Sequence, residues 1–170
     1  NPIAVGDKVE FELETKNNTE TGVITRIEER QNYIVRKSVN LSKQTHIIAA
    51  NIDQVFLLVT INNPPTFTSF IDRFLVTAEA YAIKTILVFN KTDAYDDEVL
   101  LEVKYLKQLY RKIGYDCISV SALNSKNVDA VKAKMTGKVS MFAGHSGVGK
   151  STLVNAIEPS LDLKTKEISD

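Results

Sequence analysis

The sequence of 170 residues has one cysteine, Cys117, and no tryptophan. A single cysteine excludes an intrachain disulfide and a cysteine-rich metal site within these residues. The longest apolar run, residues 55–59, is far shorter than the roughly 20 residues that cross a bilayer. The N-terminus shows no signal-peptide pattern. From these absences we expect a cytoplasmic protein that makes no membrane contact.

Charge of one sign is not in excess, since 21 Lys and Arg residues balance 21 Asp and Glu residues. A net charge of zero argues against a protein that coats nucleic acid or an anionic membrane through bulk electrostatics. Glycine is also scarce, with seven residues, yet Gly144, Gly147 and Gly149 fall within six positions. This uneven distribution directs attention to one segment of the chain.

The sequence pattern changes near residue 50. Before it, alternating and β-branched residues predict strands at residues 8–14, 21–27 and 33–36, with turn residues at 17–20. A polar stretch at residues 38–46 suits a loop or linker. We therefore expect residues 1–50 to form part of a small β-module.

From residue 51, short apolar runs alternate with helical patterns. Thr66 or Thr68 is placed to cap the first helix, and Gly114 follows the second helix at a typical C-terminal position. This alternation predicts an α/β fold with a mostly parallel sheet and flanking helices. Ligands of such sheets bind at the carboxyl ends of the strands. The predicted strands are residues 54–61, 85–89, 117–120 and 139–143, and the predicted helices are residues 67–82, 99–113, 127–135 and 150–157.

Residues 144–151 follow the last predicted strand and match the pattern G-x-x-x-x-G-K-[ST] of a phosphate-binding loop. Glycines let backbone N–H groups turn toward a phosphate, and the next helix adds its positive dipole end. Lys150 and Ser151 are the candidate catalytic residues, with Lys150 stabilising phosphate charge and Ser151 ligating Mg²⁺. His145 occupies a variable loop position, so we interpret it as a bystander and not as a base. The predicted phosphate-site residues are Gly144, His145, Ser146, Gly147, Val148, Gly149, Lys150, Ser151 and Thr152.

Residues 90–93, Asn-Lys-Thr-Asp, stand at the end of the strand predicted at 85–89 and indicate guanine recognition. The Asp93 carboxylate can accept hydrogen bonds from guanine N1–H and N2–H₂, whereas adenine would leave it unpaired. The Asn90 side chain can bond the purine edge and brace the loop, and the Lys91 stem can cover the base. A backbone N–H after the next strand can reach guanine O6. The predicted base-site residues are Asn90, Lys91, Thr92, Asp93, Ser121, Ala122 and Leu123.

The order of these motifs is circularly permuted, because the base motifs precede the phosphate loop, whereas they follow it in most GTPases. With the junction Ala49-Ala50-Asn51-Ile52-Asp53-Gln54 and the N-terminal β-module, this order resembles the ribosome small-subunit-dependent GTPase A family. The resemblance covers essentially the whole chain. It implies a cytoplasmic GTPase that uses GTP or GDP with Mg²⁺ and contacts the small ribosomal subunit and its rRNA during late maturation. We expect it to act as a monomer.

The resemblance also implies a domain plan. Residues 1–50 would be part of an OB-fold, and residues 51–170 would be the N-terminal part of the permuted GTPase domain. The switch I threonine, the D-x-x-G switch II motif and a zinc-binding domain would lie beyond Asp170. Residues 1–170 alone are therefore expected to bind nucleotide but to hydrolyse GTP poorly.

Residues 30–46 contain several cations and no acidic residue. RNA binders on OB-folds use basic grooves with aromatic stacking surfaces. The sequence alone favours a plain solvated loop, whereas the resemblance reverses that preference and favours RNA contact. The predicted RNA-binding residues are Arg30, Tyr33, Arg36, Lys37 and Lys43.

Two other functions stay open at this point. One is a non-enzymatic guanine-nucleotide switch or scaffold. The other is a P-loop ATPase or kinase, which the Asn-Lys-Thr-Asp segment disfavours.

Overall fold

The computed structural model describes residues 3–16, 19–37 and 45–165. The chain divides into two compact units, Asn1–Ile52 and Asp53–Asp170, close to the boundary predicted between residues 50 and 51. We refer to them as the N-terminal unit and the sheet unit. Within the described residues, no helix has the length and apolar character needed to cross a membrane.

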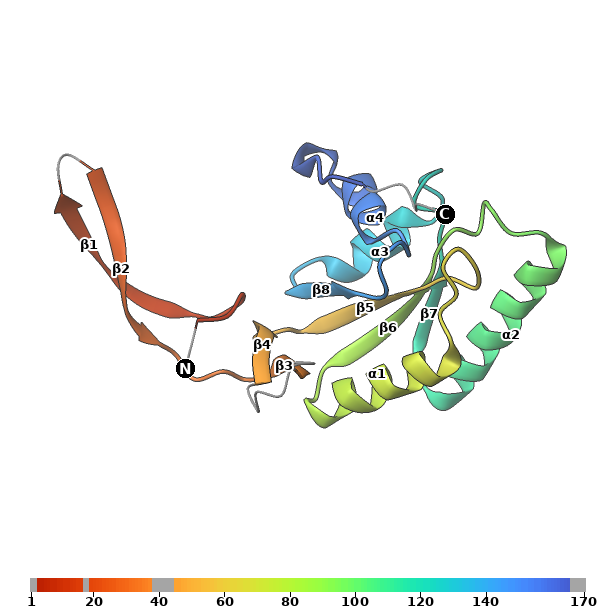
Figure 1. Cartoon of the computed structure of the whole chain (residues 1–170), viewed down its shortest axis with the longest axis horizontal. Coiled ribbons are helices and arrows are strands. Elements are labelled where there is room, and N and C mark those ends of the chain that lie inside the picture. Colours follow the sequence, from red (N-terminus) through yellow and green to blue (C-terminus); the bar gives the residue numbers. More distant parts are fainter. Residues whose placement is uncertain (1–2, 17–18, 38–44, 166–170) are drawn as a thin grey trace. The chain divides into compact units, whose positions relative to one another are not determined.

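The N-terminal unit contains two antiparallel strand pairs (Figure 1). β1 (Val9–Lys16) pairs with β2 (Thr19–Ile27), and β3 (Tyr33–Lys37) pairs with β4 (Thr45–Ala50). The strands predicted at residues 8–14, 21–27 and 33–36 are confirmed, whereas the sequence does not predict β4. The described part of the unit therefore consists of two ribbons of two strands each.

Two local predictions for this unit are wrong. Thr45 and His46, interpreted as the end of a loop, belong to β4 and pair with Lys37 and Arg36 of β3. Thr19 and Glu20, interpreted as turn residues, begin β2. In both cases the backbone pairs across the strands irrespective of side-chain polarity, which the hydropathy pattern does not reveal. Residues 17–18 and 38–44 lie outside the described residues.

Polar side chains join distant parts of the N-terminal unit. The Arg30 guanidinium donates to both carboxylate oxygens of Asp7 at 2.6 and 2.7 Å, and both side chains are largely buried. This pair lowers the pKa of Asp7 to about 2, because the guanidinium stabilises the charged carboxylate. Asn51, with a φ of 54°, donates to the Gly6 carbonyl and accepts from the Gln31 N–H. These contacts fix the chain that leads into and out of the strands.

The sheet unit contains a parallel four-stranded sheet in the order β7-β6-β5-β8. Helices α1 and α2 cover one face, and α3 and α4 cover the other (Figure 1). Every strand and helix predicted for this unit is present, with ends shifted by at most two residues, so the predicted α/β fold is confirmed. The strands are β5 (Gln54–Val59), β6 (Lys84–Phe89), β7 (Asp116–Ser119) and β8 (Ser140–Ala143), and the helices are α1 (Thr68–Ala80), α2 (Asp97–Ile113), α3 (Val128–Met135), α4 (Lys150–Ile157) and the short 3₁₀ helix η1 (Pro159–Leu161).

Apolar burial on both faces holds the sheet in place. β5 is buried along its whole length. Because successive side chains of a strand point to opposite faces, Phe56 and Leu58 pack toward α3 and α4, where they join a core with Val131 and Leu153. Burial of one such side chain contributes roughly 1.5–3 kcal/mol. Since parallel strands end at the same edge, the loops that follow them meet there.

One predicted helix cap is confirmed and one is wrong. α2 begins after Asp96, whose carboxylate accepts a hydrogen bond from the third helical N–H. It ends at Ile113 and is followed, as predicted, by Gly114 with a φ of 115°. The capping of α1 by Thr66 or Thr68 is not observed, because Phe67 occupies the N-cap position and no side chain caps the helix. The Thr66 hydroxyl instead accepts a backbone hydrogen bond just after β5, so it stabilises that loop.

Candidate nucleotide-binding site

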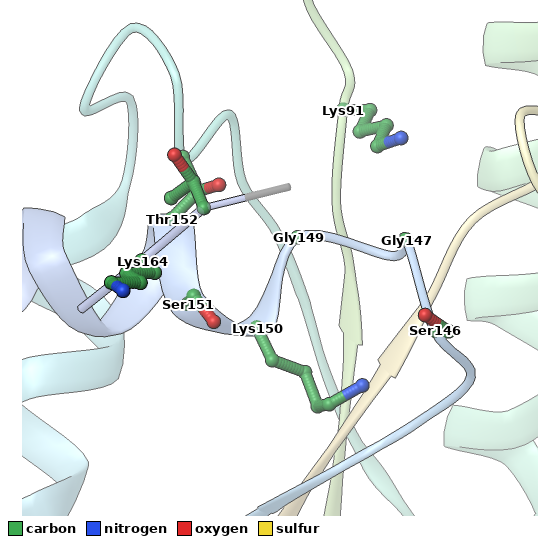
Figure 2. Close-up of a pocket in the computed structure, with 9 residues that line it drawn as sticks. Lys91, Ser146, Gly147, Gly149, Lys150, Ser151, Thr152 and Lys164 are labelled. Atoms are coloured by element: carbon green, nitrogen blue, oxygen red, sulfur yellow. The ribbon is translucent and has the colours of Figure 1, made fainter. Parts of the chain in front are cut away.

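The phosphate loop connects β8 to α4 at the carboxyl edge of the sheet (Figure 2). Gly144 has a φ of 140°, and a Cβ atom there would lie 2.7 Å from the carbonyl oxygen of Leu58. Gly149 has a φ of 93°, and a Cβ atom there would collide with the Asn90 amide. Both positions therefore require glycine, because β5 and the base-recognition segment approach the loop closely.

The Lys150 ammonium lies against the phosphate loop. Its Nζ donates to the carbonyl oxygens of Gly144 and His145 at 2.9 and 2.6 Å. Partial burial lowers the pKa of Lys150, since desolvation disfavours the charged form. An ammonium has three N–H donors, so one remains for an oxyanion. The loop thus holds a partly desolvated cation where a phosphate would bind.

A cleft of 380 Å³ opens over this loop (Figure 2). Two of its lining residues, Lys164 and Thr165, were not predicted. They follow η1, and the Asn155 amide holds their segment on α4 through two hydrogen bonds of 2.8 Å with the Leu163 backbone. Lys164 brings a further cation to the cleft. The lining residues are Lys91, Ser146, Gly147, Gly149, Lys150, Ser151, Thr152, Lys164 and Thr165.

A second pocket of 280 Å³ adjoins this cleft. The two share three lining residues, Lys91, Gly149 and Thr152. The exposed Asp93 lines the second pocket, where its carboxylate can accept hydrogen bonds from a ligand. The structure therefore places the predicted base motif beside the predicted phosphate loop. The lining residues are Asn90, Lys91, Asp93, Ala94, Ala122, Leu123, Gly149 and Thr152.

The Asn90 side chain links the three predicted motifs. It is 2% exposed. Its Nδ2 donates to the Val148 carbonyl of the phosphate loop at 2.9 Å, and its Oδ1 accepts from the Ala122 N–H at 3.0 Å. These bonds supply the bracing that the sequence suggested for Asn90. A direct contact of Asn90 with a purine stays a prediction.

Tyr95 supports the base-recognition segment and was not predicted. Its buried hydroxyl donates to the Asn90 carbonyl at 2.9 Å and accepts from the Ile61 N–H at 3.0 Å. On the other side, the Lys91 ammonium donates to the Asn63 carbonyl. The segment is thus tied to the loop after β5, which contains Ile61 and Asn63. A tyrosine five residues after Asn90 gives no sequence signal for this role.

Several predicted site residues line neither pocket. Thr92 lines a different cavity, and its hydroxyl donates to the Val120 carbonyl at 3.0 Å. The buried Ser121 hydroxyl accepts from the Asn124 N–H, so it shapes the loop. Gly144 and Val148 accept hydrogen bonds through their carbonyl oxygens, and the Val148 side chain also packs in the apolar core.

The surroundings of His145 and Cys117 indicate structural roles and not catalytic ones. The His145 ring packs on Phe70 of α1, with ring centroids 3.9 Å apart, which supports the interpretation of His145 as a bystander. Burial raises the pKa of the Cys117 thiol to about 11, so it is protonated at neutral pH.

Ser151 lies where a magnesium ligand is expected. It is the second residue of α4 and lines the phosphate cleft beside Lys150. Among the described residues, those that line this cleft include hydroxyls and cations but no carboxylate. Such a donor set fits Mg²⁺ that binds through one or two protein oxygens, waters and phosphate oxygens, and does not fit an all-protein metal cage. The residues are thus compatible with Mg²⁺ held jointly with a nucleotide.

The predicted RNA-binding residues differ in their surroundings. Arg30 is engaged in the largely buried pair with Asp7, so its structural role explains it better than RNA contact does. The sequence did not reveal this because the partners are separated by 23 positions. Tyr33 is 37% exposed. Arg36 and Lys37 lie on β3, and Lys43 lies outside the described residues.

The parallel sheet, the phosphate loop after β8 and the Asn-Lys-Thr-Asp segment after β6 define a P-loop nucleotide-binding protein with its motifs in permuted order. The sequence model of the RsgA GTPase family matches residues 27–170. The chain therefore belongs to the RsgA GTPase family, which confirms the resemblance noted from the sequence.

Relatives and solved structures agree with this assignment. The chain is 70% identical over 169 residues to the small ribosomal subunit biogenesis GTPase RsgA of Christiangramia forsetii, covering 99% of this chain and 54% of that protein. It is 65% identical over 170 residues to the protein of the same name from Flavobacterium johnsoniae, covering 100% and 52%. The chain thus spans about half the length of these curated relatives.

The fold is similar to two solved structures. YjeQ from Thermotoga maritima matches with a TM-score of 0.76 and 41% identity, over 97% of this chain and 54% of that one. YloQ, described as a circularly permuted GTPase, matches with a TM-score of 0.69 and 34% identity, over 94% and 51%. The permuted order inferred from the motifs is thus found in a solved relative.

Proposed function

We propose that the intact protein binds GTP and GDP in the two adjoining pockets of the sheet unit, hydrolyses GTP with Mg²⁺, and acts in late maturation of the small ribosomal subunit. The observation that carries the nucleotide part is the Asn90 side chain, which bonds both the phosphate loop and the Ala122 backbone. One nucleotide that fills both pockets would therefore contact a single connected structure.

The base is assigned to the pocket that contains Asp93. Guanine presents two adjacent N–H donors to a carboxylate, whereas adenine would leave that carboxylate desolvated and unpaired. The Lys91 stem and Leu123 offer apolar surface to the base in the same pocket. This arrangement favours GTP and GDP over ATP.

The phosphates are assigned to the cleft that contains Lys150. Its remaining N–H and the backbone N–H groups of the loop would bind phosphate oxygens, and Lys164 would add positive charge. Mg²⁺, held by the Ser151 hydroxyl and the nucleotide, would neutralise charge on the phosphates. Lys150 and Ser151 are therefore the candidate catalytic residues in this chain.

The partner is assigned from the relatives, which are named for biogenesis of the small ribosomal subunit. We retain rRNA contact through the OB-fold-like N-terminal unit at Tyr33, Arg36, Lys37 and Lys43, without Arg30. A monomer in the cytoplasm, and a zinc-binding domain elsewhere in the intact protein, complete the proposal.

The test is to titrate the intact protein with GDP, GTP and ATP by calorimetry, and then to measure multiple-turnover hydrolysis with and without purified small subunits. We expect GDP and GTP to bind, ATP not to compete, and subunits to accelerate turnover. Binding without turnover would indicate a guanine-nucleotide switch or scaffold instead. Competition by ATP would indicate an ATPase or kinase, and absence of nucleotide binding would refute the proposal.

A further inference from the structure

A groove of 390 Å³ lies between α2 and β7, apart from the two nucleotide pockets. Four of the ten residues that line it are cations, and none is acidic. The others include the polar residues Thr92, Gln108, Ser119 and Asn127. We call it the basic groove. Its cations are Lys104, Lys107, Arg111 and Lys126.

Three of these cations lie on one face of α2, because Lys104, Lys107 and Arg111 follow one another at helical spacing. Two of them are held against β7. The Lys107 ammonium donates to the Ser119 hydroxyl and the Arg111 guanidinium donates to the Cys117 carbonyl, each at 2.7 Å. Burial and the charge of Arg111 lower the pKa of Lys107. Positive charge is therefore concentrated and partly desolvated in the groove.

Among the residues that the structure describes, no carboxylate lines the groove. In residues 3–16, 19–37 and 45–165, none of the four cations forms an ion pair. The acidic residues of α2 are Asp97, Glu98 and Glu102, all in its N-terminal half. The helix dipole favours cations in the last turn, which contains Arg111 but not Lys104, Lys107 or Lys126. Helix stability alone therefore does not explain the cluster.

We propose that the basic groove binds the sugar–phosphate backbone of RNA. Lys104, Arg111 and Lys126 are exposed at the groove, so it is open to solvent, whereas sites for small molecules enclose most of their ligand. Cations together with amide and hydroxyl side chains are the groups that contact phosphates and sugars. The choice of rRNA as the physiological RNA rests on the proposed function, but the location of the site does not.

The groove also adjoins the base-recognition segment, residues 90–93. Thr92 lines the groove, whereas its neighbours Lys91 and Asp93 line the base pocket. Lys126 contacts the loop that contains Ser121 through two backbone hydrogen bonds of 3.0 and 3.1 Å. An RNA strand in the groove would thus lie next to both segments that surround the base.

The test compares two double variants of the intact protein. Lys104→Ala/Lys126→Ala removes two groove cations that have no side-chain partner in the described part of the chain, so the fold should be retained. Lys112→Ala/Lys138→Ala removes two exposed lysines that do not line the groove and gives the same change in net charge. GDP binding by both variants should equal that of the unmodified protein.

Binding is measured against protein-free small-subunit rRNA and against purified small subunits over a range of salt concentrations. We expect the groove variant to bind both more weakly and to lower the slope of log K against log salt by about 2, one for each lost phosphate contact. Equal binding by the two variants to protein-free rRNA would refute the proposal. Weakening on intact subunits alone would also refute it and would indicate a protein partner.

The design separates this proposal from the proposed function. If the unmodified protein bound no guanine nucleotide or no subunit, the proposed function would fail, while the comparison on protein-free rRNA would still decide the groove. Titration with inorganic phosphate supplies a further arm. Saturable phosphate binding that is lost in the groove variant, with rRNA binding unchanged, would show a site for a free phosphate and would overturn the RNA assignment.

Discussion

The two units of the chain are stabilised by different interactions. In the sheet unit, β5 is fully buried, and Phe56 is 0% exposed. In the N-terminal unit, Phe11 and Leu13 of β1 are 59% and 66% exposed. The described part of that unit depends instead on strand pairing and on polar contacts such as the Asp7–Arg30 pair.

This difference bears on where the binding residues lie. An apolar core packs in few ways, so the loops at the edge of the sheet are held in defined positions. Asn90 can bond two other loops because β6 pairs with β7 on one side, while β5 on its other side holds β8 in the same sheet. In the described part of the N-terminal unit, large apolar side chains such as Phe11 and Leu13 are exposed and form no comparable core.

The largest expected effect tests the difference in burial directly. Phe56→Ala should lower the free energy of unfolding of the sheet unit by roughly 3–5 kcal/mol, because it leaves a cavity in a packed core. Phe11→Ala, its matched control on the exposed strand, should change stability by less than about 0.5 kcal/mol. Chemical denaturation followed by circular dichroism measures both. Similar losses in the two variants would contradict the contrast between the units.

The next effect concerns the base pocket on the rigid edge of the sheet unit. Asp93→Ala should weaken GDP binding about 100-fold, because two charge-assisted hydrogen bonds are lost, and should leave ATP binding unchanged. Asp97→Ala removes an exposed carboxylate of α2 that does not line the pocket, and it serves as the control. Calorimetry measures both variants. Undiminished preference for GDP over ATP would remove Asp93 from its predicted role.

A smaller effect should test whether Tyr95 holds the base-recognition segment in place. Tyr95→Phe removes a hydroxyl that bonds the Ile61 and Asn90 backbones, and it should cost about 1–2 kcal/mol of stability with a several-fold loss of GDP affinity. Tyr105→Phe is the control, since that side chain is 63% exposed. Thermal unfolding and calorimetry provide the measurements. If Tyr95→Phe behaved like Tyr105→Phe, the bracing role would be wrong.

The smallest expected effect concerns the polar contacts of the N-terminal unit. The native pKa of Asp7, about 2, lies below its ordinary value of 3.8, so the Arg30 pair stabilises the fold above the ordinary pKa. That contribution is lost as the pH falls from about 4 toward 2. Asp7→Asn should therefore reduce stability near neutral pH and flatten its decline in acid.

Amide hydrogen exchange of β1 and β2 over a pH series measures this effect. Asp97→Asn, in the sheet unit, is the control and should follow the unmodified protein. If Asp7→Asn lost stability with pH as steeply as the unmodified protein, the ion pair would not be the source of the acid sensitivity.

The parts of the molecule that depend on neighbouring residues could be predicted from the sequence. The phosphate loop combines glycines, Lys150 and a following helix within one short segment. The end of α2 before Gly114 could be predicted because it depends only on the local backbone conformation. The continuous apolar run of β5 indicates burial on both faces.

The parts that depend on distant residues could not be predicted. Arg30 is predicted as an RNA contact because it lies in a basic stretch without acidic residues, and the sequence does not reveal its distant partner Asp7. The sequence does not predict β4, because this strand is defined by its backbone pairing with β3 and not by a pattern of apolar and polar side chains. Lys164 reaches the phosphate cleft only because η1 returns the chain to α4.

The sequence by itself determined the class of fold, the phosphate loop, the guanine motif and their permuted order, since each is written in short segments of specific residue types. Only the tertiary structure decided that Asn90 connects the motifs, that Tyr95 braces them and that four cations line a separate groove. The physical reason is that hydrogen bonds and charge clusters act through space. Their partners come from strands and helices that meet only when the apolar core of the sheet unit has formed.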